Sequence, residues 1–443
     1  MIFWPARRGG PCGRPVVRPL WLPNQNSIFQ KAQTSRTFTM AKIQTHEFRM
    51  VAKTIFGLEE ILAGELLMLG AKNVKEHNRA VSFTGDLGFM YKANLNLRTA
   101  LRVLKPIAEF TIKNEQELYD EIKKIDWAEY MDVTDTLAID CVVGSDLFSH
   151  SQFLSQKSKD AIVDQFREAF GERPSVDLDH PSLRINLHIK DDNCIVSLDS
   201  SGESLHKRGY RDKTNLAPIN EVLAAGLVLL SGWDRRSAFI DPMCGSGTIL
   251  IEAAMIACRI PPGYYREQYG FQQWKDYDAD LWDKIYEVSI GKINEKPVQL
   301  TGIEISSNVI RKARENVKLA KLDDVITIHN TAFQEFEPPE GPGVVIINPP
   351  YGERMHQEED INGLYESMGD TFKKKYKGYS AWIISSNMEA LKHVGLRPSK
   401  KITVFNGQLE CRFVRFDMYD GSKKLSKQKP DDTVEPVLKD APE

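Results

Sequence analysis

The sequence lacks the marks of several protein classes. No apolar run approaches the ~18 residues of a membrane-spanning helix, the longest candidate being 223–230. Six cysteines are scattered over 443 residues without a C-x-x-C pair. This spacing argues against a disulfide scaffold, a zinc ribbon and an iron–sulfur cluster. We therefore expect no metal site, no membrane function and a reducing, cytoplasmic compartment.

The chain also lacks a large excess of charge of either sign. It has 58 basic and 61 acidic residues, a net charge of -3. Any affinity for nucleic acid must therefore come from local patches and not from a global field. The length, with 42% hydrophobic and 27% charged residues, is enough for two or three packed domains.

The amino-terminal segment contains no acidic residue before Glu47. We expect 1–42 to be a disordered basic leader, for which three interpretations are open. It is an organellar leader, a basic arm that touches RNA, or translated sequence upstream of a true start at Met40. Its prolines interrupt any amphipathic transit helix, so we favour the mis-assigned start. The polar segment 420–443 is predicted to be a disordered tail.

The hydrophobic pattern divides the rest of the chain into two regions. In the first we expect a strand from Phe48, a helix with its apolar face at 58–69, a strand near 80–83, a helix at 115–124, a strand at 136–143, a helix at 151–170, and strands at 182–189 and 193–199. In the second, helices at 220–230, 248–257 and 308–320 alternate with strands at 238–241, 299–304 and 343–348. The first region is an α+β module. The alternation in the second predicts a doubly wound parallel sheet with ligands at the carboxyl ends of its strands.

The first chemical motif is DPMCGSGT, in which Asp241 ends a strand and Gly245 and Gly247 form the turn into a helix. Glycines there let a nucleotide-like ligand approach the backbone near a helix amino terminus. A third glycine is missing, because Leu250 stands in its place, and no Gly-Lys-Ser/Thr follows, which disfavours dinucleotide and P-loop sites. The acid suits a cationic amino-acid group such as the methionine end of S-adenosylmethionine. Cys244 is interpreted as a small filler.

The second motif is LTGIEISS, in which a strand ends at Glu304. A carboxylate there can accept hydrogen bonds from ribose hydroxyls. The separation from Gly247 exceeds the ~20 residues of a compact unit, so residues 259–296 form an insertion. Its aromatic stretch PPGYYREQYGFQQW is either a substrate-facing flap or a self-packed loop.

The third motif is VVIINPPYGERM, where an apolar strand delivers Asn348 to its end. Pro349 and Pro350 fix the following backbone beside Tyr351. The Asn348 side-chain carbonyl and the Pro349 carbonyl can accept hydrogen bonds from an exocyclic amine, and Tyr351 can stack on its base. This chemistry suits methyl transfer to an amine on an aromatic ring, with the rate coming mainly from positioning. The N-P-P-Y motif contains no cysteine, which argues against the pyrimidine C5 methyltransferases, because these need a covalent nucleophile.

Together these motifs resemble the class I S-adenosylmethionine-dependent methyltransferases. The match is closer still, because SLDSSGESLHKRGYR, LAPINEVLAA and DPMCGSGTILIEAA resemble the THUMP-domain RNA guanine-N2 methyltransferases, in the family of the amino-terminal half of the ribosomal RNA methyltransferase RlmL. The resemblance implies a ferredoxin-like part at 43–84, an RNA-capturing THUMP domain at 85–200 and a Rossmann-like methyltransferase domain with a mostly parallel seven-stranded sheet at 201–419.

The resemblance also implies a set of site residues. The target amine is assigned to Asn348, Pro349, Pro350 and Tyr351, and the cofactor S-adenosylmethionine to Asn215, Ala217, Pro218, Asp241, Pro242, Cys244, Gly245, Ser246, Gly247, Thr248, Glu304, Ile305, Ala332 and Asn348. One departure concerns the adenine amine. In this family an aspartate that binds the adenine amine is frequent after the fourth strand, and this chain has Thr331 there. The backbone of Ala332 could bind the adenine amine instead.

Basic residues cluster where the two regions join. They are His206, Lys207, Arg208, Arg211 and Lys213. They either grip RNA phosphates, which we favour, or form a solvated face between domains.

The leading hypothesis is transfer of a methyl group to guanine N2 in large-subunit ribosomal RNA. A tRNA guanine-N2 methyltransferase has the same two modules. An adenine-N6 DNA methyltransferase also uses N-P-P-Y, but the THUMP-like half disfavours it. An RNA-binding assembly factor without turnover is the non-catalytic alternative, disfavoured by the intact Asp241, Glu304 and Asn348. No obligate protein partner is expected.

Overall fold

The computed structural model describes residues 46–211, 219–294, 299–350 and 358–419. The predicted leader (1–42) and tail (420–443) lie outside these ranges. Among the described residues, no helix combines the length and apolar character needed to cross a membrane.

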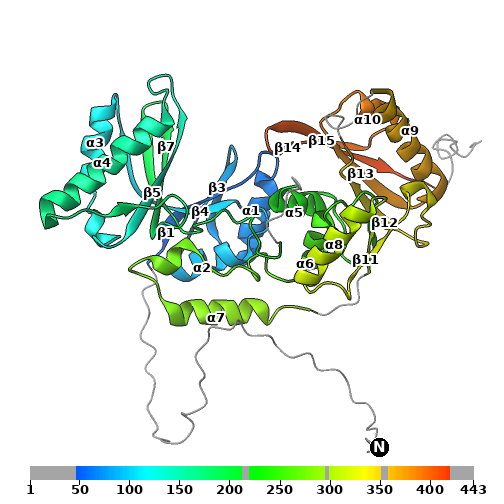
Figure 1. The fold of residues 1–443 in the computed structure, drawn as a ribbon, viewed down its shortest axis with the longest axis horizontal. Helices are drawn as coiled ribbons and strands as arrows, with labels where there is room; N and C mark the ends of the chain where they lie inside the picture. Colours follow the sequence, from blue (N-terminus) through cyan, green and yellow to red (C-terminus); the bar gives the residue numbers. More distant parts are fainter. Residues whose placement is uncertain (1–45, 212–218, 295–298, 351–357, 420–443) are drawn as a thin grey trace, which may run out of the picture. The chain divides into compact units, whose positions relative to one another are not determined.

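The amino-terminal region is built on one sheet with helices packed against it (Figure 1). Its strands are β1 (Phe48–Lys53), β2 (Lys72–His77), β3 (Ala80–Gly85), β4 (Arg102–Thr111), β5 (Thr136–Gly144), β6 (Ser175–Val176), β7 (Leu183–Lys190) and β8 (Asn193–Asp199). Its helices are α1 (Glu59–Leu69), α2 (Leu87–Asn96), α3 (Glu115–Lys124) and α4 (Ser151–Phe170). The strand order is β2-β3-β1-β4-β8-β7-β5-β6. The hydrophobic pattern did not predict β2, α2, β4 or β6.

Strand β4 joins the two halves of this sheet. It pairs antiparallel with β1, where Val51 lies opposite Leu104, and antiparallel with β8, where Leu104 lies opposite Asp199. The ferredoxin-like part and the THUMP part of the sequence therefore share one continuous eight-stranded sheet.

The aromatic stretch of the insertion belongs to the core of this amino-terminal region. Tyr269, Phe271 and Trp282 are buried there, and the ring of Phe271 stacks on that of Tyr91 with centroids 4.3 Å apart. The helix that follows, α7 (Ala279–Ile290), packs on α2 (Figure 1). These rings are thus packing groups, and the alternative of a substrate-facing flap is wrong for them.

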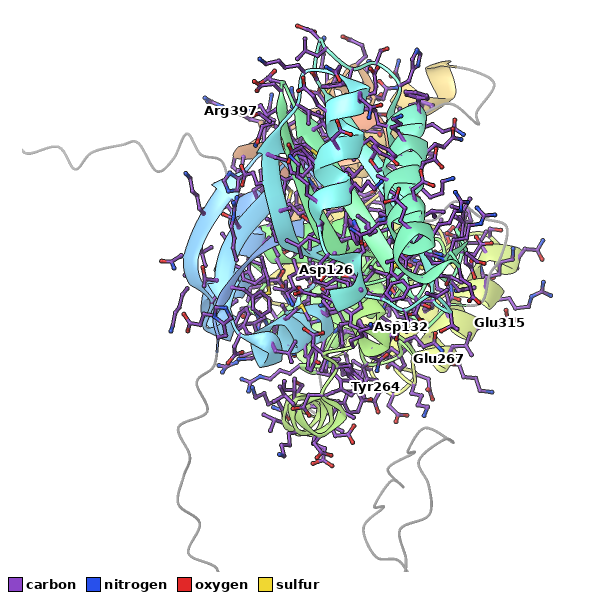
Figure 2. The ribbon with its side chains drawn as sticks, turned by 90° about the vertical axis from the view of Figure 1, so that its left-hand side faces the viewer. Asp126, Asp132, Tyr264, Glu267, Glu315 and Arg397 are labelled. Carbon is purple, nitrogen blue, oxygen red and sulfur yellow. The ribbon has the colours of Figure 1, made fainter. Side chains whose placement is uncertain are left out.

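The insertion is also bound to the amino-terminal region by polar contacts. Lys275 Nζ donates to Ala128 O at 2.8 Å and pairs with Asp132 at 2.6 Å. Figure 2, which labels Asp132 together with the insertion residues Tyr264 and Glu267, views the molecule from this side.

The carboxy-terminal region is a seven-stranded sheet with helices on both faces. Its strands are β9 (Ala238–Asp241), β10 (Leu300–Ile303), β11 (Ile326–His329), β12 (Gly343–Ile347), β13 (Tyr379–Ser385), β14 (Lys400–Asn406) and β15 (Leu409–Asp417). Its helices are α5 (Glu221–Leu230), α6 (Thr248–Ala257), α8 (Ser307–Leu319), α9 (Glu358–Lys375) and α10 (Ala390–His393). The strand order is β11-β10-β9-β12-β13-β15-β14. Strands β9 to β13 are mutually parallel, and only β15 runs against its neighbours.

Each face of this sheet has its own hydrophobic core. One core holds residues of α5, α6 and α8, and the other holds residues of α9 and α10. Because β9 lies between β10 and β12, the direction in which successive strands are added reverses at β9, which is where ligands bind in open α/β sheets. The prediction of a mostly parallel, Rossmann-like sheet preceded by an α+β region is confirmed.

Candidate active site and the groove beside it

Three predicted polar side chains lie at the carboxyl ends of neighbouring strands of the parallel sheet. Asp241 is the last residue of β9 and lies opposite Gly302 of β10, so Glu304 stands two residues beyond that level. On the other side Ile240 lies opposite Val345 of β12, which places Asn348 two residues beyond the level of Asp241. The sheet therefore brings Asp241, Glu304 and Asn348 to one edge, as the sequence predicts.

The turn after β9 depends on its two glycines. Gly245 has φ +53° and Gly247, the amino-terminal cap of α6, has φ +81°, a left-handed region that side chains rarely adopt. A Cβ atom built on Gly245 meets nothing within 4 Å. The turn thus leaves open space over its backbone, which fits a ligand lying against it.

Glu304 is held in place by backbone donors. Gly245 N donates to Glu304 Oε2 at 3.2 Å, and Ser306 N donates to Oε1 at 2.8 Å. The Asn330 side chain donates to the Glu304 and Ile305 carbonyls, each at 3.0 Å. The carboxylate is half-buried, so its remaining lone pairs are available for ribose hydroxyls.

Asp241 is a buried carboxyl group without a cationic partner among the described residues. Its one hydrogen bond there is from Met243 N at 3.3 Å. Burial, with a smaller contribution from the negative charge of Glu304, raises the pKa of Asp241 to about 8. A nearby cation stabilises the ionised form of a buried carboxyl group. The α-ammonium group of S-adenosylmethionine is such a cation. The residues present therefore fit this cofactor.

The other predicted cofactor residues surround these three. Pro242, Cys244 and Thr248 are buried, Ser246 O accepts from Asn316 Nδ2 at 3.0 Å, Ile305 is 72% exposed, and Ala332 precedes a short helical turn after β11. Burial raises the pKa of the Cys244 thiol well above its usual range, in keeping with a filler. Thr331 donates to Glu335 at 3.0 Å. Asn215, Ala217 and Pro218 lie outside the described residues.

The N-P-P-Y motif follows β12 directly. Asn348 is half-buried, Pro349 is buried and Pro350 is exposed. Tyr351 lies outside the described residues, so its stacking role stays a prediction.

Arg208 departs most from its predicted role. Only 2% of its side chain is exposed, and it pairs at 3.3 Å with Glu252 of α6, which is fully buried. Tyr210 donates to the same carboxylate at 3.0 Å, and Arg208 also donates to Arg98 O at 2.6 Å. A guanidinium in this setting cannot reach a phosphate, so Arg208 is a structural residue, and neither of the two readings of the basic cluster describes it.

The other members of the basic cluster differ in exposure. Arg211 pairs with Glu221 at 3.3 Å and donates to Thr248 at the start of α6. Burial lowers the pKa of His206 to about 4, so it is neutral at physiological pH. Lys207 is exposed and pairs with Glu203 at 2.7 Å. Lys213 lies outside the described residues. Of the described cluster, Lys207 is the cation most available to RNA.

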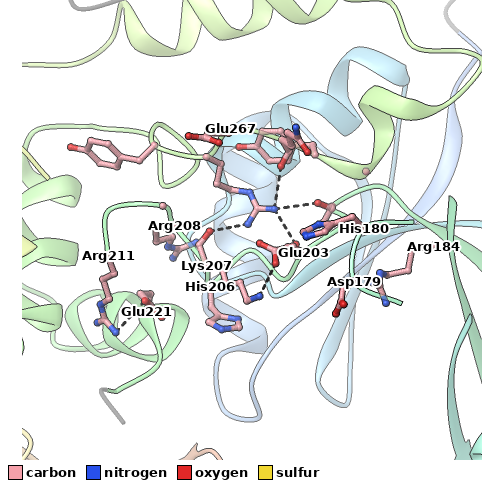
Figure 3. A pocket seen from close by; sticks show the side chains of 18 of the residues that line it. Asp179, His180, Arg184, Glu203, His206, Lys207, Arg208, Arg211, Glu221 and Glu267 are labelled. Carbon is pink, nitrogen blue, oxygen red and sulfur yellow. Dashed lines mark hydrogen bonds and ion pairs between the residues drawn. The ribbon is translucent and has the colours of Figure 1, made fainter. Parts of the chain in front are cut away.

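These residues line a groove of about 840 Å³ (Figure 3). Its walls come from Asp179, His180 and Arg184 of the amino-terminal region, from the linker between the two regions (residues 201–211) and from the insertion. Arg266 of the insertion fixes the linker, because its guanidinium donates to the carbonyls of Ser204 and Lys207 at 3.0 and 2.9 Å. Arg266 and Glu252 were not predicted from the sequence, because only the folded chain shows which distant groups they contact.

Three family descriptions match consecutive parts of the chain. "RlmL ferredoxin-like domain" matches residues 49–104, "THUMP domain" residues 113–199, and "RMKL-like, methyltransferase domain" residues 208–415. A putative RNA methyltransferase, slr0064 of Synechocystis, is 41% identical over 364 residues, which cover 82% of this chain and 95% of that protein.

A longer relative and a solved structure extend the comparison. The ribosomal RNA large subunit methyltransferase K/L of Syntrophotalea carbinolica is 40% identical over 82% of this chain, but the match spans only 52% of that protein. The crystal structure of SMU.472, a putative methyltransferase complexed with SAH, matches with a TM-score of 0.76 and 29% identity over 85% of this chain and 99% of that one. This chain therefore belongs to the THUMP-containing RNA methyltransferases of the RlmL type, whose cofactor is S-adenosylmethionine.

Proposed function

We propose that the protein transfers a methyl group to the exocyclic N2 amine of a guanosine in large-subunit ribosomal RNA. The observation that carries this proposal is the position of Asn348 at the end of β12, on the same sheet edge as Asp241 and Glu304. An amine acceptor held at Asn348 is thereby adjacent to the site that fits the methyl donor.

The residues of the chain act by binding and orientation. The cofactor supplies an electrophilic methyl group. Asp241 holds the cationic amino-acid end of that molecule and Glu304 holds its ribose. The Asn348 side-chain oxygen and the Pro349 carbonyl would accept hydrogen bonds from the two N–H groups of the target amine, which directs its lone pair toward the methyl group. As the carbon–nitrogen bond forms, the bond between the methyl group and sulfur would break, and the amine would lose one proton to solvent. Alignment of this kind lowers the barrier without a strong base.

The choice of RNA follows from the rest of the chain and from its relatives. A THUMP domain precedes the methyltransferase domain, and the K/L relatives are named for large-subunit ribosomal RNA. These relatives are about twice as long as the matched segment, so their substrate is carried over here as part of the proposal. A cytoplasmic location, favoured by the dispersed cysteines, belongs to the same proposal.

The test is the identity of the methylated nucleoside. The purified protein is incubated with tritiated S-adenosylmethionine and, separately, with ribosomal RNA, tRNA and DNA, and the labelled nucleoside is identified after digestion. We expect N2-methylguanosine in large-subunit RNA. Label in tRNA or DNA would move the substrate to one of the alternatives, and cofactor binding without label in any of them would favour an assembly factor.

A further inference from the structure

A second groove lies between the amino-terminal region and the β14–β15 hairpin. It has a volume of about 570 Å³ and is lined by Phe56, Asn78, Arg79, Thr403, Phe405, Glu410 and Arg412. Phe56 follows β1, and Asn78 and Arg79 form the turn between β2 and β3. The two regions meet closely here, since a Cβ atom on Gly57 would come within 2.3 Å of Thr403 O.

This groove opens on the catalytic edge of the parallel sheet. Ile347 of β12 lies opposite Ile383 of β13, and two residues further Ser385 lies opposite Arg412 of β15, which in turn lies opposite Thr403 of β14. Arg412 and Thr403 are therefore level with the residue after Asn348, and Phe405 projects beyond that edge. Three strand spacings separate β12 from β14, about 14 Å across the sheet.

The groove presents aromatic rings to solvent. Phe56 is 39% exposed, and its ring meets that of Phe405 edge to face with centroids 5.5 Å apart. The Arg79 guanidinium lies over the Phe405 ring, 5.3 Å from its centroid. Exposed phenyl rings and a planar guanidinium are the surfaces on which unpaired bases stack.

The groove also holds a cation that has no acidic partner among the described residues. Glu410 pairs with Arg412 at 3.0 Å. Within the described part of the chain, no carboxylate pairs with the Arg79 guanidinium. This group lies over the Phe405 ring in a cation–π contact. One unneutralised guanidinium therefore faces a groove large enough for a nucleotide.

The backbone of Arg79 is fixed in an unfavourable conformation. Its φ is +55°, a value at which glycine is preferred. Arg79 N donates to Glu59 Oε1 at 2.9 Å, and Arg79 O accepts from Thr54 N at 2.9 Å. The turn thus presents an arginine side chain where glycine would fit with less strain.

From these observations we propose that the groove binds one unpaired nucleotide of the RNA substrate, next to the segment that carries the target base. The base stacks on Phe56 and its phosphate contacts Arg79. The proposal rests on the RNA substrate of the family and of the proposed function, and it does not depend on which base is methylated or in which RNA.

The test measures binding of a fluorescein-labelled, unstructured RNA 12-mer to the full chain saturated with S-adenosylhomocysteine. Arg79→Gly removes the cation at a backbone position that suits glycine, so the melting temperature should stay within about 2 °C of the wild type. We expect a loss of about 5- to 10-fold in RNA affinity and a slope of log Kd against log salt reduced by about 0.7. Phe56→Leu should weaken binding by about 5-fold or more, because it removes a stacking ring but retains apolar volume.

Arg397→Gly is the matched control. Arg397 is exposed (Figure 2), and its replacement by glycine removes the same charge. It precedes the amino end of β14, whereas the groove residue Phe405 lies at the carboxyl end of that strand. It should leave the affinity and the salt slope unchanged. S-adenosylmethionine affinity should be unchanged in all three variants.

Three results would overturn the proposal. The first is unchanged RNA affinity and salt slope in both groove variants, and the second is no binding of the 12-mer by the wild type. The third is a loss of RNA affinity that accompanies equal losses of thermal stability and cofactor affinity, which would make the groove a packing contact only. Failure to find N2-methylguanosine would refute the proposed function, whereas the binding results would still decide this proposal.

Discussion

The backbone N–H of Gly245 donates to the Glu304 carboxylate at 3.2 Å. This bond joins the turn after β9 to the acid after β10, so the two parts that we propose to receive the amino-acid end and the ribose of the cofactor are held together. Ser306 N binds the other oxygen of the same carboxylate at 2.8 Å. The geometry of the cofactor site therefore depends on Glu304 even before a ligand binds.

Glu304→Gln should weaken S-adenosylmethionine binding by about 10- to 100-fold, the effect of losing charge-assisted hydrogen bonds. Isothermal titration calorimetry measures this change directly. Glu315→Gln is the matched control, because Glu315 is exposed on α8 (Figure 2) and should bind the cofactor like the wild type. Equal affinities of the Glu304 and Glu315 variants would contradict the role of Glu304.

Asp241 should make cofactor binding depend on pH. Its pKa is raised to about 8 in the free protein, and the cationic ligand binds the ionised form, so binding releases a proton below that pH. Affinity should rise from pH 6 toward pH 8 and then stop rising, because the ligand ammonium itself has a pKa of ~7.7–8.0. Dissociation constants measured across this range test the dependence.

Asp241→Asn supplies the control for that dependence. The variant should bind weakly, and its affinity should be flat between pH 6 and 7.5. Since burial raises the pKa of Asp241 in the folded chain far above that in the unfolded chain, the carboxyl group takes up a proton on folding at neutral pH. This uptake costs stability, and the cost shrinks as pH falls below the folded pKa. The cofactor-free variant should therefore melt at a higher temperature, by roughly 2–4 °C for each kcal/mol recovered. A pH dependence retained in the variant would assign the titration to another group.

The elements with strong local signals could be predicted from the sequence. Helix α3 was predicted with its observed bounds, and its amino terminus is capped by Asn114, whose side chain accepts from Gln116 N and Glu117 N at 3.0 and 2.9 Å. Strand β2 could not, because KNVKEH has no apolar alternation and is mostly exposed. Its pairing with β3 stabilises it as a strand, and this contact is not visible in the local pattern.

In the candidate site, too, some features could be predicted from the sequence and others could not. The common position of Asp241, Glu304 and Asn348 could be predicted because each lies at the carboxyl end of an apolar strand, and parallel strands bring these ends to one edge. Arg208 was misread because its partner Glu252 is 44 residues further along the chain. A cluster of basic residues in the sequence gives no information on which of them the fold will bury.

Arg208→Ala should destabilise the protein by about 3–5 kcal/mol, because it leaves Glu252 buried without its partner. Urea denaturation measures this loss. Arg208→Lys should also destabilise it, since an ammonium group lacks the fork that reaches both Glu252 and Arg98 O. Lys207→Ala, one residue away and exposed, should leave the unfolding midpoint unchanged. Wild-type stability with weakened RNA binding in Arg208→Ala would restore the RNA-contact role.

Asn348→Ala should separate binding from turnover. Asn348 directly follows β12 and is proposed to bind the target amine, so its loss should remove orientation of the acceptor and leave the carboxylates proposed to hold the donor. We expect kcat to fall by about 100-fold or more, with a dissociation constant for S-adenosylmethionine within about threefold of the wild type. Single-turnover methylation with pre-bound cofactor measures the first quantity, and calorimetry the second.

Because an aspartate retains the shape but cannot be a neutral acceptor, Asn348→Asp should lose turnover as well. Equal losses of binding and turnover in Asn348→Ala would instead make Asn348 a cofactor ligand, and the amine would need another acceptor at this edge.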